Sequence, residues 1–202
     1  MNYPNGIKKT NNNKTITYKN RGMTLEQDLN ITNQYYIDND IAYIYKKPTP
    51  IKVVKASYNE FGNRVIKEAY YSEPSTTDYN GIYKGYYLDY EAKETKNKLG
   101  FPIHNIHKHQ IKHLRNITKE NGICFLIIRF TSLDETYLLP ARDFLDFLDN
   151  NQKSSIPLIY IKEKGMLIKN KLLKRIDYLE IVDKLWRLEW KRKVVKIKVK
   201  LV

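Results

Sequence analysis

The sequence predicts an α/β fold, in which helices flank a mixed β-sheet and a β-hairpin projects from the body. Two observations lead to this prediction. Stretches with helical spacing of apolar residues alternate with β-rich runs in the second half of the chain, and two earlier β-rich runs are joined by turn-forming residues. With 202 residues, 42% of them hydrophobic, the chain is long enough to bury a core.

The expected elements can be placed along the chain. Thr24 begins a helix over 24–38, and a strand over 41–46 ends at two prolines, which cannot donate to a β-ladder. Ile51–Tyr58 and Arg64–Tyr71 form the candidate hairpin, joined by 59–63. Later expectations are a hairpin over 76–95, a helix over 107–119, strands over 123–130 and 137–139, a helix over 141–148, helical spacing over 176–190 and an alternating strand over 194–202. The segment 152–164 gives no clear prediction.

The charge balance indicates a polyanionic partner. The net charge is +14 and the pI is about 9.6, and Lys and Arg side chains bind phosphates while releasing the counterions condensed on nucleic acid. Five basic and no acidic residues precede residue 22, and seven basic residues accompany one glutamate from Arg187 onward. A solvated tail and a nucleic-acid-binding arm explain these ends equally well.

Several classes are disfavoured. The single cysteine, Cys124, lies in an apolar run, which excludes a disulfide framework and a multi-cysteine zinc site. The polar N-terminus lacks the apolar segment of a signal peptide and no run is long enough to span a membrane, so a cytoplasmic location is expected. The absence of a phosphate-binding glycine loop argues against a nucleotide-driven motor.

The segment Ser75–Lys96 contains the most informative side chains. A two-residue turn at Lys84 and Gly85 places Asp78 opposite Glu91, and Thr76 opposite Lys93. Opposed carboxylates repel each other unless a cation lies between them, and Mg²⁺ binds through one or two carboxylates plus a substrate phosphate. Lys93 is suited to orient a metal-bound water or to stabilise charge that develops on phosphate oxygens, so the group suits phosphodiester hydrolysis.

Two alternatives compete with this site. A turn at Asn80 and Gly81 is the stronger local hairpin signal and would place Asp78 opposite Tyr83, but it leaves a very short return strand. The other alternative is an amphipathic strand with Asp89, Glu91 and Lys93 in solvent, and spacing alone favours it.

Four histidines, His104, His107, His109 and His113, form a weaker candidate site. His109 and His113 have the i, i+4 spacing of a zinc-metalloprotease pair, but Gln110 replaces the general-base glutamate. Histidines on the surface or facing DNA are therefore favoured over a zinc site.

The candidate hairpin combines basic and aromatic side chains, namely Lys52, Lys55, Arg64 and Lys67 with Tyr58 and Phe61 near its tip. This mixture suits phosphates and bases. Without further context, an ordinary hairpin with a polar face is favoured.

Two longer stretches, PSTTDYNGIYKGYYLDYEAKETKNK from Pro74 and FPIHNIHKHQIKHL from Phe101, strongly resemble the RecU family of Holliday junction resolvases. RGMTLEQDLN from Arg21, KKPTP from Lys46, NGICFLI from Asn121 and KRIDYLEI from Lys174 resemble family segments in the expected order. The resemblance covers about residues 18–186, and it outweighs the alternative in which Glu91 and Lys93 lie in solvent. The segments 152–170 and 187–202 depart from the family pattern.

This resemblance implies a homodimeric endonuclease with a restriction-endonuclease-like fold, dependent on Mg²⁺ with Mn²⁺ as a substitute. The implied substrate is a four-way DNA junction, cut by paired nicks on opposing strands in recombination and repair, with other recombination proteins as further partners. The implied metal ligands are Thr76, Asp78, Glu91 and Gln110, and Lys93 matches the lysine that stabilises the transition state.

The same resemblance implies how the chain is divided. Residues 1–20 form a flexible basic arm, 21–186 the nuclease domain and 187–202 a basic extension. The hairpin, at about 53–71, corresponds to a stalk that enters the junction centre, which gives Lys55, Tyr58, Phe61, Arg64 and Lys67 a DNA-binding role. The resemblance also implies that Arg21 contacts DNA from the flexible arm. The rival functions are a non-catalytic binder of branched nucleic acid and a related nuclease with another substrate, such as a restriction enzyme.

Overall fold

The structure is a computed structural model that describes residues 24–71 and 76–185. The predicted basic arm over 1–20, Arg21, the extension over 187–202 and the strand over 194–202 lie outside the described residues.

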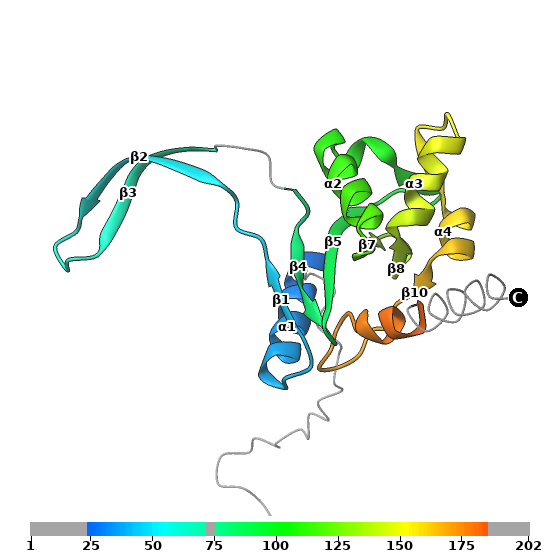
Figure 1. Ribbon diagram of the computed structural model, residues 1–202, viewed down its shortest axis with the longest axis horizontal. Coiled ribbons are helices and arrows are strands. Elements are labelled where there is room, and N and C mark those ends of the chain that lie inside the picture. Colours follow the sequence, from blue (N-terminus) through cyan, green and yellow to red (C-terminus); the bar gives the residue numbers. More distant parts are fainter. Residues whose placement is uncertain (1–23, 72–75, 186–202) are drawn as a thin grey trace, which may run out of the picture.

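A six-stranded mixed sheet forms the centre of the body (Figure 1). Its strands, in spatial order, are β1 (Tyr43–Lys46), β4 (Tyr79–Tyr83), β5 (Tyr86–Thr95), β7 (Ile123–Phe130), β8 (Glu135–Pro140) and β10 (Met166–Leu167). β5 and β7 are parallel, while the other neighbouring pairs are antiparallel. The helix α2 (Lys108–Lys119) lies in the connection between β5 and β7, as a parallel crossover requires.

Helices cover both faces of this sheet, which confirms the predicted α/β class (Figure 1). On one face, α1 (Leu25–Asp38) and the segment 176–182 pack on an apolar cluster that includes Tyr90, Phe125 and Tyr178. On the other face, α2, α3 (Ala141–Asn150) and α4 (Leu158–Lys164) enclose a second cluster that includes Leu126 and Phe144. β5 and β7 are therefore covered on both sides.

The start of α1 agrees with the sequence prediction. The Thr24 hydroxyl accepts the Gln27 backbone N–H at 3.2 Å, and the Gln27 side chain accepts the Thr24 N–H at 3.0 Å. This reciprocal capping box satisfies two donors that a helix end otherwise leaves unpaired. The helix begins at Leu25 and ends at Asp38, close to the predicted 24–38.

The hairpin of β4 and β5 has the predicted turn at Lys84 and Gly85. Both residues have positive φ, 51° and 81°, and the register pairs Tyr79 with Tyr90 and Tyr83 with Tyr86. The alternative turn at Gly81 is wrong, because Gly81 lies within β4. A Cβ there would come within 2.1 Å of the Tyr43 carbonyl oxygen, so this glycine allows β1 to approach closely.

The second hairpin, β2 (Ile51–Tyr58) and β3 (Arg64–Tyr71), has the predicted bounds and forms a sheet of its own. It projects well away from the body (Figure 1). The Asn59 side-chain oxygen closes its turn by accepting the N–H groups of Phe61 and Asn63. Almost all of its residues are exposed, and a two-stranded hairpin without a core is only marginally stable in water.

Several elements differ from the prediction or were not predicted. The unassigned 152–164 forms β9 (Ser155–Pro157) and α4, and β9 pairs with β6 (Gly100–Pro102), which precedes the 3-10 helix η1 (Ile103–Asn105). Within the predicted helix over 176–190, Ile176 instead forms a β-bridge with Asn170, and the described helix covers 179–185. The first strand begins at Tyr43 rather than at residue 41, the strand over 137–139 extends to 135–140, and the helix predicted to end at 148 ends at Asn150. None of the helices within 24–71 and 76–185 has the length and apolarity needed to cross a membrane.

Candidate functional site

The strand β5 directs Asp89, Glu91 and Lys93 to the sheet face covered by α2. Side chains alternate along a strand, so these three residues share one face, while Leu88 and Tyr90 lie in the core of the other. Asp89 and Glu91 are both 0% exposed, and the Lys93 side chain is 24% exposed. The alternative of an amphipathic strand with a solvated face is thus wrong for Asp89 and Glu91, which α2 covers.

One carboxylate oxygen of Glu91 has two polar partners, and the other has none among the described residues. Its Oε1 lies 2.5 Å from the Lys93 ammonium and accepts a hydrogen bond from the Gln110 side-chain amide at 2.6 Å. Its Oε2 is buried and has no hydrogen-bond partner among the described residues. Burial, and next the charge of Asp78, raise the pKa of Glu91 to about 7 although Lys93 opposes the shift. A cation at Oε2 would relieve both causes.

Asp78 lies beside Glu91, immediately before β4. Its Oδ2 accepts the Ala92 N–H at 3.1 Å, and its carbonyl oxygen accepts the Lys47 N–H at 2.8 Å. The paired register ends at Tyr79, so backbone contacts outside the ladder place Asp78 against β5. The structure thus brings Asp78, Glu91 and Lys93 together as predicted.

Gln110 joins this group from the first turn of α2. The side chain is buried, its oxygen accepts the His107 N–H at 2.9 Å, and its nitrogen donates to Glu91. In this arrangement Gln110 caps the helix and orients the Glu91 carboxylate. Rotation of this amide group would turn its oxygen toward the carboxylates and give up the hydrogen bond from the His107 N–H.

Thr76 occupies a different position from the one predicted. The side chain is exposed, and its hydroxyl accepts a hydrogen bond from the Lys47 ammonium at 3.0 Å rather than facing Lys93 across a ladder. The physical reason is that β4 begins only at Tyr79, so the two-residue alternation of a strand does not extend back to Thr76.

A cleft opens beside these residues and includes a carboxylate that sequence reasoning missed. Asp78, Ala92 and Lys93 line it from the sheet, together with Tyr79 and Glu94, and Thr24, Leu25 and Glu26 line it from the start of α1. Glu26 pairs there with Lys46, Nζ to Oε1, at 2.5 Å. The only sequence signal for Glu26 was an acid in the first turn of a helix, which is common and does not indicate proximity to β5.

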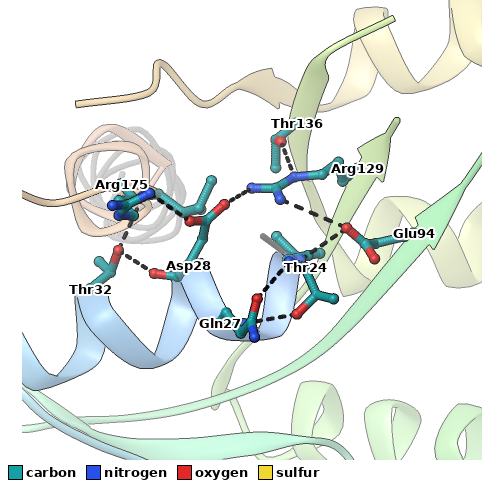
Figure 2. Close-up of polar contacts among 10 residues, drawn as sticks. Thr24, Gln27, Asp28, Thr32, Glu94, Arg129, Thr136 and Arg175 are labelled. Carbon is teal, nitrogen blue, oxygen red and sulfur yellow. Dashed lines mark hydrogen bonds and ion pairs between the residues drawn. The ribbon is translucent and has the colours of Figure 1, made fainter. Parts of the chain in front are cut away.

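Figure 2 shows how α1 is fixed at this cleft. Glu94, which follows Lys93, accepts the Leu25 N–H at 2.9 Å and lies 3.7 Å from Arg129. Arg129 also pairs with Asp28 at 2.7 Å, and Arg175 reaches the other Asp28 oxygen at 3.4 Å. This largely buried network connects α1, β5 and β7, and it therefore sets one wall of the cleft.

The histidines do not form the alternative zinc site. His113 lies 3.0 Å from Asp89, and the rings of His107 and His109 stack with centroids 5.4 Å apart. The described residues contain no group of three or more His, Cys, Asp or Glu side chains arranged to hold a metal ion. The carboxylates Asp78 and Glu91 remain a two-carboxylate pair, which is the usual protein contribution to an Mg²⁺ site completed by water and phosphate.

The hairpin that carries the predicted DNA-binding side chains projects away from the central sheet (Figure 1). Tyr58 and Phe61 are 76% and 86% exposed at its outer end. Lys55 lies 3.9 Å from Glu68, so part of its charge is compensated, while Arg64 pairs with Tyr58 in the ladder. Lys67 is exposed on β3. Arg21 lies outside the described residues.

Comparison with known proteins identifies the family. The sequence matches the family described as Recombination protein U, RecU, over residues 20–184. This chain belongs to the RecU family. A RecU relative from Oceanobacillus iheyensis, named Holliday junction resolvase RecU, is 50% identical over 195 residues, covering 92% of this chain and all of the relative. A RecU relative of the same name from Staphylococcus aureus strain JH9 is 48% identical over 199 residues, covering 92% of this chain and 96% of the relative.

A solved structure, the Holliday junction resolvase Hjc from Archaeoglobus fulgidus, is similar at 11% identity with a TM-score of 0.39. The aligned region covers 68% of this chain and 93% of the Hjc chain. RecU membership confirms the resemblance found in the sequence.

Proposed function

We propose that this chain is an endonuclease that resolves Holliday junctions by metal-dependent nicking of opposing strands in recombination and repair. The observation that supports it most strongly is the Glu91 carboxylate, which has one buried oxygen without a partner beside Asp78 and Lys93. Relatives named Holliday junction resolvase cover nearly the whole chain and support the choice of substrate.

Asp78, which lines the cleft, and the buried Glu91 beside it fit a divalent metal ion. Asp78 and Glu91 supply hard oxygen ligands, and the charge repulsion between them is the cost that a cation removes. Gln110 is a further proposed ligand after rotation of its amide, and Thr76 would have to leave its contact with Lys47 to become one. Mg²⁺, or Mn²⁺ in its place, would supply Lewis-acid polarisation of the phosphate and a more acidic bound water.

The chain's own residues would carry out the remaining tasks. Before a metal ion binds, Gln110 and Lys93 hold Oε1 of Glu91, so the free oxygen has a fixed direction. The Lys93 ammonium, which is partly exposed and lines the cleft, is placed to contact a phosphate that enters it. Its charge would stabilise the negative charge that develops on the phosphate oxygens as the bond to the leaving oxygen breaks.

A homodimer suits paired nicking. A four-way junction presents two related strands, and a two-fold dimer presents two equivalent clefts, so each cleft would cut one strand. The projecting β2–β3 hairpin would then select the junction, because its exposed aromatic and basic side chains could enter the open centre that a linear duplex lacks.

The rival functions make different demands on the cleft. A non-catalytic binder has no use for a buried carboxylate that lacks a partner, because such a group only destabilises the fold. A restriction enzyme acts on linear duplex and has no use for a hairpin that enters a junction centre.

A comparison of substrates tests the proposal. Purified protein is incubated with a labelled four-way junction or a linear duplex of the same sequence, with Mg²⁺, with Mn²⁺ or with chelator. We expect symmetric nicks in the junction only when metal is present. Cleavage of both DNAs at equal rates would favour a general nuclease, and junction binding without cleavage under every condition would favour the non-catalytic binder.

A further inference from the structure

Asp89, two residues before Glu91 on the same face of β5, is buried among donors that the proposed reaction does not use. Its Oδ1 accepts a short hydrogen bond from the Thr77 hydroxyl. Its Oδ2 contacts the Lys47 ammonium at 2.9 Å, the Tyr87 hydroxyl at 2.7 Å and His113 Nε2 at 3.0 Å. Unlike Glu91, Asp89 therefore has no unpartnered oxygen to offer a metal ion.

The electrostatics of the two carboxylates differ accordingly. Burial raises the pKa of Asp89, but hydrogen bonds from His113, Lys47, Thr77 and Tyr87 outweigh it and hold that pKa below its usual value. Asp89 thus serves as the charged partner of the Lys47 ammonium at 2.9 Å, whereas the pKa of Glu91 is raised.

Lys47 extends the contacts of Asp89 to the metal-site segment. Its ammonium contacts Thr76 Oγ1 at 3.0 Å and Thr77 Oγ1 at 2.6 Å as well as Asp89, so its three donors meet three oxygens. Its backbone N–H donates to the Asp78 carbonyl. With only 14% of the Lys47 side chain exposed, removal of Asp89 would leave this charge largely buried and poorly compensated.

We infer that Asp89 is a positioning residue that, through Lys47 and Thr77, holds the segment 76–78 so that the Asp78 carboxylate stays beside Glu91. This inference rests on the proposed function for its consequence in catalysis. Lys47 precedes the residues that lead into β2, Thr76 lies after β3 in the chain, and the Lys47 ammonium contacts both Thr76 and Asp89. Through Lys47, Asp89 therefore connects the base of the β2–β3 hairpin to the proposed metal ligand Asp78.

The test measures local exchange in the metal-free full chain. The backbone amides of Lys47 and Ala92 both donate to Asp78 and report on its position, while amides of β7 report on the core. In Asp89→Asn and in Lys47→Met we expect the backbone amides at positions 47 and 92 to exchange about tenfold faster or more. The exchange rates of the β7 amides should be unchanged. The double variant should be no worse than the more affected single variant, because both changes disrupt one network.

Asp183→Asn is the matched control, since Asp183 pairs with Lys84 at the opposite end of the β4–β5 hairpin. It should leave both reporter amides unchanged. If Asp89→Asn does not fold, Lys47→Met decides. Wild-type exchange at both amides in a folded variant, or faster exchange shared equally by β7, would overturn the inference.

A second measurement addresses the reaction. In Asp89→Asn and Lys47→Met, the Mg²⁺ concentration for half-maximal junction cleavage should rise about tenfold, because a displaced Asp78 weakens metal binding. The cleavage rate should recover at high Mg²⁺. An unchanged Mg²⁺ dependence in these variants contradicts the inference. Absence of cleavage by the wild-type chain contradicts the proposed function instead, and the exchange measurement still stands.

Discussion

Lys93 contacts only one of the two carboxylate oxygens of Glu91: its ammonium lies 2.5 Å from Oε1, and Oε2 has no partner among the described residues. The two side chains are adjacent on one face of β5, so the strand itself creates this pair. The lysine offsets only part of the cost of burying the carboxylate, because burial and Asp78 still hold the pKa of Glu91 near 7.

The carboxylates should be required for cleavage but not for binding. Asp78→Asn and Glu91→Gln each remove a hard ligand while retaining the side-chain shape, whereas affinity for DNA comes mostly from phosphate contacts elsewhere. We expect cleavage to fall below detection with the junction dissociation constant changed less than about threefold. Gel-shift and cleavage assays on the same preparation measure both, and a matching loss of binding would contradict this assignment.

Lys93→Ala should lower turnover far more than affinity. A positive charge directed at the developing phosphate charge acts in the transition state, so we expect a rate loss of about a hundredfold or more with little change in junction affinity. Single-turnover cleavage at saturating protein isolates the chemical step. Lys162→Ala, which removes an exposed pair with Glu135, is the control. Near wild-type turnover would remove Lys93 from the mechanism.

The raised pKa of Glu91 should make the metal-free protein less stable as pH rises. Its folded pKa of about 7 lies above the ordinary 4.5, so between these values the folded state binds more protons than the unfolded state. The free energy of unfolding therefore falls from about pH 4.5 to 7 and stays lowered above, by up to about 3 kcal/mol.

Glu91→Gln should remove this contribution, since glutamine does not ionise. Chemical denaturation at a series of pH values, in chelator, should give a variant more stable than wild type at pH 8 and similar to it at pH 4. Mg²⁺ should raise the melting temperature of the wild type but not of the variant, because ligands that bind the folded state stabilise it. If the wild type and Glu91→Gln show the same pH dependence of stability over this range, the Glu91 carboxyl is not protonated in the folded protein.

The network that fixes α1 should contribute strongly to stability. In Arg129→Met, the buried Asp28 and the nearby Glu94 lose their shared cation, and removal of one partner from a buried pair costs about 3 kcal/mol or more. Arg115→Met is a matched control, since Arg115 makes an exposed pair with Asp149 and should change stability by less than about 1 kcal/mol. The free energy of unfolding is measured by urea unfolding. Equal decreases in Arg129→Met and Arg115→Met would show that the network stabilises the fold no more than an exposed ion pair does.

The sequence predicted well those features that depend on local patterns. The ends of β2, β3, β7 and α1 follow from β-rich runs, turn residues and a capping box, and the Lys84–Gly85 turn sets the β4–β5 register that brings the residue before β4 alongside β5. Other features depend on contacts between distant segments. The burial of Asp89 requires α2 and Lys47, and the approach of Glu26 to the cleft requires Asp28, Arg129 and Glu94. No spacing within β5 or α1 could have indicated them.

The hairpin should select junctions over linear duplex. Ser57 and Val65 are paired in the ladder, so residues 58–64 can be replaced by Asn-Gly, which closes a two-residue turn while keeping the register. This change removes Tyr58, Phe61 and Arg64, which are the aromatic side chains and one cation at the outer end. We expect junction affinity and cleavage to fall about tenfold or more, because base stacking and phosphate contacts at the junction centre are lost, with weaker binding to duplex retained.

A second variant separates stacking from hairpin length. Tyr58→Ser combined with Phe61→Ser keeps the hairpin but removes its exposed rings, and Leu172→Ser combined with Leu173→Ser removes exposed apolar side chains from another surface. If the rings stack on bases, the first pair should reproduce much of the loss on junctions and the second pair should not. All variants are compared at one salt concentration, because phosphate contacts are strongly salt dependent. Equal losses on junction and duplex would mean that the hairpin is a general binding element and that selectivity arises in the body of the protein.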